Sequence, residues 1–316
     1  MKTVLITGAA GFIGTNLVLR LLEDPYVFVV GVDNLLTSAK PTIENERIQF
    51  IQCDIVSETY LLDAIDHVDE IYHLASIASP PKYKKYPIET LDVNVIGTRN
   101  ILDYALRRRA KFILASTSEV YGDPVVNPQH ESYYGNVNTV GERSCYDESK
   151  RCAETYVYEY RRKYGLDFKI CRIFNTYGPH MDLHDGRIVT NIMKSMFYNY
   201  PVTIYGDGTQ TRSLCYIDDL LDGIMALMAS KETGPINLGN PYTEICIADL
   251  VKMLENIANI RVPVNYVERT ENDPVQRKPD ITLAQAKLGF EPKVDLDDGL
   301  HRTLLHFILE NQDNIV

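Results

Sequence analysis

The stretch from Gly8 to Gly14 most constrains how this chain can fold. It reads Gly8-Ala9-Ala10-Gly11-Phe12-Ile13-Gly14, directly after the strand-like residues 3–7 and at the start of a helix-like stretch, 14–22. Glycine permits a tight turn and a close approach of the backbone to a pyrophosphate, and a helix amino terminus adds amide donors and a positive dipole. The strand–turn–helix context therefore predicts a dinucleotide phosphate site at Gly8, Gly11, Phe12, Ile13 and Gly14.

Short β-rich apolar runs alternate with helical patterns along the first half of the chain. The expected strands cover residues 3–7, 27–32, 48–53, 70–75, 111–116 and 167–173, and the expected helices include 14–22, 93–108 and 149–164. Such alternation predicts parallel strands joined by helical crossovers and covered on both faces. The predicted fold class is α/β, a Rossmann-like doubly wound parallel sheet with a smaller C-terminal α/β domain that binds the substrate.

The pattern loosens from about Tyr177, where Pro, Gly, Asp and Tyr become frequent. Later segments include a strand-like run at 236–238, a helix near 248–257 and a polar, proline-bearing stretch at 268–279. We expect residues 1–177, with about 211–240, to form the NAD-binding domain. Residues 178–210 and 241–316 are expected to bind the substrate, and 216–230 to pack back on the first domain.

Asp33 ends the second expected strand, 19 residues after Gly14. A carboxylate there can accept from a ribose 2′-hydroxyl and would repel a 2′-phosphate, which favours NAD over NADP. An Asp-Asn turn is the alternative for Asp33, and plain strand burial is the alternative for Leu74 and Ala75. The other cofactor-binding residues predicted at or near strand ends are Asn34, Thr37, Asp54, Ile55, Leu74, Ala75, Ser76, Ser116 and Thr176.

Tyr146 and Lys150 stand four residues apart in Cys145-Tyr146-Asp147-Glu148-Ser149-Lys150, in front of a helix-like stretch. Side chains at that spacing leave one helix face. A phenol with a pKa near ~10 is a poor base, but a neighbouring ammonium favours the phenolate. The pair is predicted to remove a proton from a sugar hydroxyl during hydride transfer, and to contact the cofactor. Such pairs also occur on ordinary helices, so the prediction depends on the surrounding motifs.

Composition argues against several other classes of protein. The net charge of −11 disfavours a nucleic-acid partner, which needs a basic face. No apolar run approaches the length of a membrane span, and the amino terminus resembles a strand more than a signal peptide. The six cysteines are scattered and no histidine or cysteine spacing suggests a metal, so we expect free thiols, a cytoplasmic location and no metal.

With the glycine motif, Thr117 and the Tyr146–Lys150 pair together, the chain resembles the extended short-chain dehydrogenase/reductase family. Further blocks at 74–81, 115–124, 172–179, 185–187 and 277–280 are similar to its UDP-glucuronate decarboxylases, or UDP-xylose synthases. The resemblance covers nearly the whole chain. It implies a carboxy-lyase that uses NAD, oxidises C4 of a UDP-sugar, loses carbon dioxide from the 4-keto intermediate and regenerates the cofactor.

The resemblance also implies catalytic roles. Thr117 would assist Tyr146 and Lys150, and Glu119 and Arg277 would act around the sugar carboxylate and the reprotonation step. Ser118 stands where the related 4,6-dehydratases carry an acidic Asp, so an elimination would lack its proton donor. The alternatives are a small residue closing a strand for Ser118, and surface ion pairing for Glu119 and Arg277.

Substrate contacts follow from the same resemblance. Asn175, Arg187 and Arg212 are candidates for the diphosphate, Tyr205 for the uracil, and Tyr60 and Tyr160 for the sugar or nucleotide, with Asn100 and Arg277 completing the set. The chain has 21 tyrosines, so core packing competes for any single one. Two positions depart from the decarboxylase pattern. Ile77 replaces a proline, and Asp92 replaces a lysine near the sugar carboxylate, where Lys82, Lys84 or Lys85 would have to compensate.

Other functions stay open on sequence alone. A nucleotide-sugar 4-epimerase or 4,6-dehydratase would share the oxidation at C4, and a non-catalytic NAD sensor would share the fold. The Arg277 block disfavours the epimerase, and the presence of both Tyr146 and Lys150 disfavours the sensor. The helices at 93–108 and 149–164 carry more apolar surface than the sheet needs, which predicts a homodimer through a four-helix contact.

Overall fold

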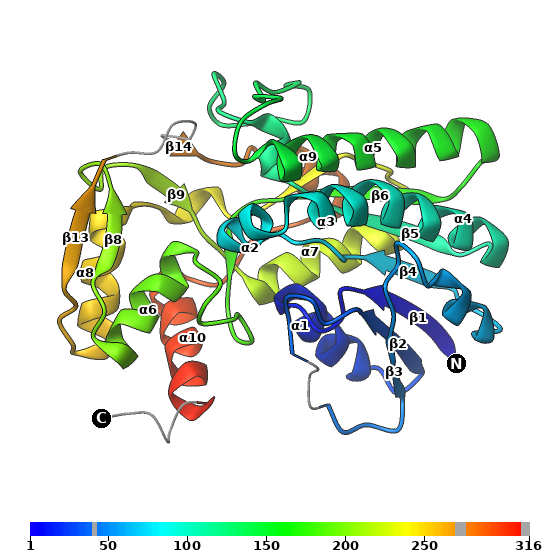
Figure 1. Cartoon of the computed structure of the whole chain (residues 1–316), viewed down its shortest axis with the longest axis horizontal. Helices are drawn as coiled ribbons and strands as arrows, with labels where there is room; N and C mark the ends of the chain where they lie inside the picture. Colours follow the sequence, from blue (N-terminus) through cyan, green and yellow to red (C-terminus); the bar gives the residue numbers. More distant parts are fainter. Residues whose placement is uncertain (40–42, 269–275, 311–316) are drawn as a thin grey trace.

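A computed structural model describes residues 1–39, 43–268 and 276–310 of the chain (Figure 1). Its centre is a seven-stranded sheet in which every pair of neighbouring strands is parallel. The strands, in spatial order, are β11 (Ile236–Leu238), β6 (Phe168–Ile173), β5 (Lys111–Thr117), β4 (Glu70–His73), β1 (Lys2–Thr7), β2 (Val27–Asp33) and β3 (Ile48–Gln52). The predicted fold class is confirmed.

The strand order reverses beside β1. From β1 the chain runs to β2 and β3 on one side, and then crosses to β4, β5 and β6 on the other. At such a switch point the loops leave the carboxyl ends of two neighbouring strands in opposite directions, which opens a crevice for a ligand. Thr7 and His73 mark these ends on β1 and β4 and are paired in register.

Helices cover both faces of the sheet, as the continuous apolar strands require. Helices α1 (Phe12–Leu22) and α7 (Ile217–Ala229) contact each other on one face, and α4 (Thr98–Arg108) and α5 (Ser144–Tyr164) contact each other on the other. Alternate side chains of β1 point into two separate cores, with Val4 and Ile6 in one and Leu5 in the other. The expected return of residues 216–230 corresponds to α7, which contacts β5, β6 and β11.

Two helices differ from expectation at their amino ends. The helix expected at 93–108 is preceded by α2 (Pro80–Lys85) and α3 (Pro87–Asp92) and includes one π-helical segment, η2 (Val93–Gly97). The helix expected at 149–164 is α5, which begins at Ser144. Tyr146 therefore lies in the first turn of the helix rather than in front of it.

The later part of the chain builds small sheets beside the large one. Its helices are α6 (Ile188–Tyr198), α8 (Ile247–Ala258), α9 (Thr282–Leu288) and α10 (Leu296–Glu310). Its strands are β7 (Thr176–Tyr177) with β10 (Cys215–Tyr216), β8 (Val202–Tyr205) with β13 (Val264–Val267), and β9 (Thr211–Ser213) between β12 (Glu244–Cys246) and β14 (Gln276–Arg277). Within the polar stretch expected at 268–279, residues 269–275 lie outside the described residues.

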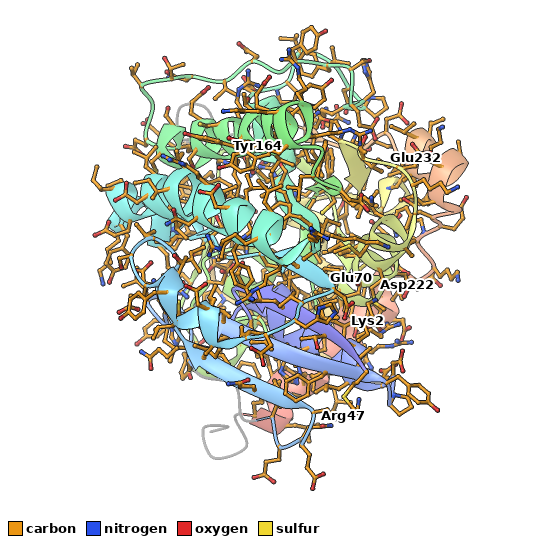
Figure 2. All side chains as sticks on the ribbon, turned by 90° about the vertical axis from the view of Figure 1, so that its right-hand side faces the viewer. Lys2, Arg47, Glu70, Tyr164, Asp222 and Glu232 are labelled. Carbon is orange, nitrogen blue, oxygen red and sulfur yellow. The ribbon has the colours of Figure 1, made fainter. Side chains whose placement is uncertain are left out.

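An ion pair lies at the amino-terminal edge of the large sheet. Figure 2 shows Lys2 and Glu70 there, and their charged groups lie 2.7 Å apart, which fixes the start of β1 beside the start of β4. In the described ranges no helix is long and apolar enough to cross a membrane.

Candidate active site

A cavity of about 2380 Å³ opens at the carboxyl ends of the strands. It is lined from both parts of the chain, from the Gly8–Gly14 turn at one end to Tyr205 and Arg212 at the other. All predicted catalytic and cofactor-binding residues line it. Of the predicted substrate contacts, Asn175, Arg187, Tyr205, Arg212 and Arg277 do so as well.

The glycine turn forms one wall of the cavity with no room for side chains. Gly8 has φ +73°, and a Cβ there would lie 2.8 Å from the backbone nitrogen of Ala75. A Cβ on Gly14 would lie 2.1 Å from the carbonyl oxygen of Gly8. The turn is therefore packed tightly against the loop after β4 and against its own helix. This close packing suits a backbone that binds a pyrophosphate at a helix amino terminus. These residues fit an NAD diphosphate.

Asp33 closes the cofactor end of the cavity. Its Oδ2 accepts from the backbone nitrogen of Ala10 at 3.1 Å, and its Oδ1 accepts from Leu35 at 2.8 Å and from the hydroxyl of Ser38 at 3.2 Å. The Asp turn considered as the alternative is thus present, and the same carboxylate also faces the glycine turn. One residue can serve both purposes because a carboxylate has about four acceptor sites.

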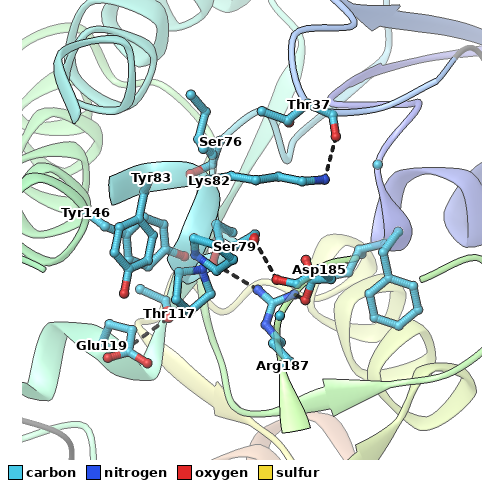
Figure 3. A pocket seen from close by; sticks show the side chains of 18 of the residues that line it. Thr37, Ser76, Ser79, Lys82, Tyr83, Thr117, Glu119, Tyr146, Asp185 and Arg187 are labelled. Carbon is cyan, nitrogen blue, oxygen red and sulfur yellow. Dashed lines mark hydrogen bonds and ion pairs between the residues drawn. The ribbon is translucent and has the colours of Figure 1, made fainter. Parts of the chain in front are cut away.

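A set of polar contacts joins the cofactor loop to the loop after β7. The ammonium of Lys82 lies 2.7 Å from the carbonyl oxygen of Thr37 (Figure 3). It also lies 2.6 Å from Asp182 Oδ2. Nearby, Ser79 donates to the Asp185 carbonyl at 2.6 Å, and Arg187 donates to the Ala78 carbonyl at 3.1 Å. We call the Lys82–Thr37–Asp182 contact the strap, because it spans the cavity between two separate segments.

Tyr146 and Lys150 both lie on α5 and are nearly fully buried. The Lys150 ammonium donates to the Ala115 carbonyl at 2.9 Å and lies 6.0 Å from the centre of the Tyr146 ring. Burial raises the pKa of Tyr146 to about 12, although Arg187 and a hydrogen bond with Thr117 act in the opposite direction. Burial likewise lowers the pKa of Lys150 to about 8.

The raised pKa of Tyr146 thus disagrees with the expectation that Lys150 makes the phenol acidic. Loss of hydration outweighs the neighbouring charges, because the uncharged forms of both side chains are favoured in a buried site. The cation that most lowers the pKa of Tyr146 is Arg187, from the loop after β7.

Tyr83 packs directly against the catalytic tyrosine. The two rings are stacked, with centroids 5.4 Å apart and planes inclined by 8° (Figure 3). The lysines around Tyr83 are engaged elsewhere. Lys82 belongs to the strap, Lys84 lies 2.5 Å from Glu142, and Lys85 lies over the Tyr86 ring. Compensation of Asp92 by one of these lysines, considered above, would thus require breaking an existing contact.

Glu119 lies between two guanidinium groups, as its ion pairs with Arg143 and Arg277 show. Its burial alone would raise the pKa of the carboxyl group, but Arg143 and Arg277 outweigh this and lower it to about 2. The three residues come from η3 (Ser118–Tyr121), the residue before α5, and β14. Asp147 lies beside this cluster, with its Oδ2 3.9 Å from Arg143 Nε.

The end of β5 is tied to α5 beneath the cavity. Ser116 donates to Glu154 at 2.5 Å, and Glu154 pairs with Arg172 of β6 through two hydrogen bonds of 2.9 and 2.7 Å. Thr117 accepts from the backbone nitrogen of Glu119 at 3.2 Å, and Ser118 is buried beside it. These contacts fix the strand end from which Thr117, Ser118 and Glu119 project.

Three predicted substrate contacts do not line the cavity. Tyr60 is 65% exposed on η1 (Thr59–Ala64), Tyr160 donates to Asp103 at 2.8 Å, and Asn100 donates to the carbonyls of Ile55 and Val56 at 2.9 and 3.0 Å. Asn100 instead holds the loop that carries Asp54 and Ile55. We do not carry these three forward as substrate contacts.

Tyr83, Arg143 and Asp147 are among the cavity residues that sequence reasoning missed. Tyr83 stands among the lysines considered for charge alone, and Asp147 lies inside the Tyr146–Lys150 motif. Arg143 precedes Asp147 by four residues, a spacing that on a helix predicts a pair. That spacing was the available signal, but it required a helix beginning near Ser144.

One cluster of potential metal ligands exists that sequence spacing did not suggest. His180, His306 and Glu310 each offer an atom within 4.8 Å of the others. The Nε2 atom of His306 accepts from the backbone nitrogen of His180 at 2.9 Å and lies 3.2 Å from Glu310. These contacts connect α10 to the loop after β7.

The doubly wound sheet, the glycine turn and the buried Tyr146–Lys150 pair define a Rossmann-type dinucleotide enzyme of the short-chain dehydrogenase/reductase kind. The chain belongs to the NAD dependent epimerase/dehydratase family, whose model matches residues 4–239.

Several relatives of the chain are named as UDP-glucuronic acid decarboxylases. The chain is 48% identical over 301 residues to UDP-glucuronic acid decarboxylase 5 of Arabidopsis thaliana, covering 94% of this chain and 86% of the relative. It is 44% identical over 319 residues to UDP-glucuronic acid decarboxylase 1 of Xenopus tropicalis, covering 99% and 74%. Among solved structures, UDP-glucuronic acid 4-epimerase of Bacillus cereus in complex with UDP-glucuronic acid and NAD matches with a TM-score of 0.86 and 30% identity, covering 98% and 99%.

Proposed function

We propose that this protein decarboxylates UDP-glucuronate to UDP-xylose with NAD, through a 4-keto intermediate and with internal recycling of the cofactor. Its relatives at 44–48% identity over nearly the whole chain are UDP-glucuronic acid decarboxylases. The observation that carries the proposal is the pairing of Glu119 with Arg277. These residues, assigned to the sugar carboxylate by resemblance, lie far apart in sequence and meet in the cavity that holds Tyr146.

The proposed chemistry begins at C4 of the sugar. Tyr146 takes the C4 hydroxyl proton, assisted by Thr117 and by the charges of Lys150 and Arg187. Bound NAD supplies the acceptor for the C4 hydride and its later return. The C4 ketone is β to the C6 carboxylate, so carbon dioxide can leave while the ketone receives the electron pair as an enolate. C5 is then protonated and Tyr146 returns its proton to the C4 oxygen.

Residues of the glycine turn and Asp33 are proposed to bind NAD, with Asn34, Thr37, Asp54, Ile55, Leu74, Ala75, Ser76, Ser116 and Thr176 along its length. For the UDP moiety we propose Asn175, Arg187, Tyr205 and Arg212, which line the same cavity. Arg guanidinium groups suit a diphosphate because they donate two parallel hydrogen bonds.

Mass spectrometry of UDP-glucuronate incubated with the protein and NAD tests the function. We expect a product lighter by one carbon dioxide. A product of unchanged mass with altered configuration at C4, which nuclear magnetic resonance distinguishes from unreacted substrate, would establish the epimerase instead, which the likeness to a UDP-glucuronic acid 4-epimerase structure keeps as second candidate. Loss of water would establish a dehydratase, and an unchanged substrate would contradict all three.

We further propose that the protein forms a homodimer and works in the cytoplasm. Apolar side chains are exposed on neighbouring elements α3, η2 and α5, namely Ile88, Leu91, Ile96 and Tyr158. They would pair with their copies as the four-helix contact requires. All six cysteines are free thiols in the structure, which supports a reducing compartment.

A further inference from the structure

The proposed decarboxylation consumes a proton, and this inference rests on that function. The bond between C5 and C6 breaks, C6 leaves as neutral carbon dioxide, and the electron pair left on the enolate must take up a proton at C5. Tyr146 cannot supply it, because the proton that Tyr146 removes from the C4 hydroxyl is returned to the C4 oxygen. The site therefore needs a second acid.

Glu119 is poorly suited to be that acid. It is buried between Arg143 and Arg277, and these two cations lower the pKa of its carboxyl group to about 2. Only a small fraction of Glu119 would carry a proton near neutral pH. Its ionised form is instead the group that keeps the two guanidiniums in place.

Asp147 is the other carboxyl group of this cluster. It lines the cavity, is only 6% exposed, and its Oδ1 atom has no hydrogen-bond partner among the described residues. Burying a carboxylate without a full set of hydrogen-bond donors costs more free energy than burying the protonated acid. We propose that Asp147 is the acid that supplies the proton taken up at C5 after carbon dioxide leaves.

The charges around Asp147 agree with this role. Burial and the negative charge of Glu119 raise the pKa of Asp147 to about 7, and Glu148 adds to this rise. Arg143 and Arg277 act in the opposite direction. The phenols of Tyr83 and Tyr146 are near enough that Asp147 raises the pKa of each. A group with a pKa near the working pH can both give up a proton and regain it from solvent.

Tyr83 is the nearest competitor for the role. Its hydroxyl is buried and also has no hydrogen-bond partner in the described part of the chain. Burial is the main cause that raises the pKa of this phenol above its ordinary value, so it gives up a proton reluctantly. Asp147 is the better acid of the two.

The first test is the pH dependence of turnover in Asp147→Asn, with Glu148→Gln as matched control. Asn keeps the shape of the side chain but carries no acidic proton. Because the acid form of Asp147 predominates below about pH 7, the wild-type rate of C5 protonation should fall as the pH rises through that value. The Asp147→Asn variant should lose this fall in rate with rising pH and should turn over about 100-fold more slowly than wild type at pH 6. Glu148→Gln, next to it on α5 and partly exposed, should keep the fall in rate and move it only slightly to lower pH, because Glu148 makes a smaller contribution to the pKa of Asp147 than burial and Glu119 do.

The second test follows the new bond at C5. In heavy water the wild-type product should carry deuterium at C5 in one configuration, as nuclear magnetic resonance of UDP-xylose would show. Asp147→Asn should give slow turnover with mixed configuration at C5, because solvent then delivers the proton without orientation. Adding formate to Asp147→Ala should restore part of the rate. An unchanged pH profile together with a single configuration at C5 in Asp147→Asn would overturn the proposal.

The tests also separate this inference from the function on which it rests. If wild-type protein releases no carbon dioxide, the function fails and Asp147 has no such role. In a second outcome the wild type decarboxylates while Asp147→Asn no longer oxidises C4, which would appear as no NADH absorbance on adding substrate. Asp147 would then be needed for the structure of the site and not as the acid at C5. That outcome would overturn the proposal while leaving the function intact.

Discussion

At the scale of single residues, burial sets the chemistry of the site more than neighbouring charge does. Tyr146 and Lys150 both shift toward their neutral forms because they have lost water. The pKa of Glu119 is lowered toward the charged form only because Arg143 and Arg277 both contact its carboxylate. The protonation states in this site therefore depend first on which interactions replace water at each polar atom.

Tyr146→Phe tests the proposed base. The change removes one hydroxyl from a stacked, buried ring and leaves its packing on Tyr83 intact, so the fold should persist. We expect turnover to fall by about 100- to 10,000-fold, the usual range for a lost acid–base group. The matched control is Tyr134→Phe, whose ring is 88% exposed and which should keep full activity. Near-normal turnover in Tyr146→Phe would rule out this base.

Gly14→Ala tests the glycine turn. The added Cβ would lie 2.1 Å from the Gly8 carbonyl, so the turn must move. We expect a loss of about 1–3 kcal/mol in stability and weaker NAD binding, measured by thermal unfolding and calorimetric titration. Gly165→Ala is the control, since φ +73° strains it while nothing lies within 4 Å of its Cβ. It should lose some stability but bind NAD normally, and equal NAD affinity in both variants would contradict the role of the turn.

At the scale of elements, the strap of Lys82 links the cofactor loop after β2 to the loop after β7. It is partly exposed, with 24% of the Lys82 side chain and 44% of the Asp182 side chain accessible. Because such pairs contribute at most about 1 kcal/mol, we expect a modest effect on cofactor retention rather than on the chemical step.

Lys82→Ala should accordingly release NAD up to about fivefold faster, as about 1 kcal/mol implies. Stopped-flow displacement of NAD by an excess of a fluorescent analogue would measure the rate. Lys85→Ala removes a charge from the same helix without touching the strap and should leave the rate unchanged. Equal dissociation rates in the two variants would show that the strap does not retain the cofactor.

Sequence periodicity predicted the long elements and the short strand at 236–238, but it missed the two-residue strands. The strands at 27–32 and 111–116 and the helix at 14–22 are present, with bounds shifted by one or two residues. The two-residue strands β7, β10 and β14 were not predicted, because each exists only through a partner distant in sequence. The start of α5 was placed too late, since Cys145 and Tyr146 carry little helical preference of their own.

At the scale of the whole molecule, the exposed apolar face on α3, η2 and α5 is the surface that we propose pairs with its copy in a homodimer. Ile96→Asp should dissociate it, because a buried carboxylate without a partner is costly. Light scattering would show half the wild-type mass. Leu305→Asp introduces the same charge at an exposed apolar position on α10 and should stay dimeric. A wild-type protein that is monomeric at working concentrations would refute the dimer itself.

The candidate site shows where sequence reasoning ends. The glycine turn and the Tyr146–Lys150 pair are local patterns, so their proximity to a crevice followed from the predicted fold. The contacts of Glu119 with Arg143 and Arg277 join three segments of the chain, and no spacing in the sequence links them. The acidity expected for Tyr146 was misjudged for a related reason, because burial is a property of the folded molecule.

The outermost strand of the large sheet has a consequence for synthesis. Strand β11 pairs with β6, yet the chain leaves the sheet after β6 and builds α6, β8 and β9 before it returns. While the ribosome is still synthesising the residues between β6 and β11, the hydrogen-bonding groups on the outer edge of β6 face solvent without a neighbouring strand, and such unpaired edges pair with other chains. Nascent chains of this protein should therefore aggregate most readily, and depend most on a chaperone, before Ile236–Leu238 emerges from the ribosomal exit tunnel.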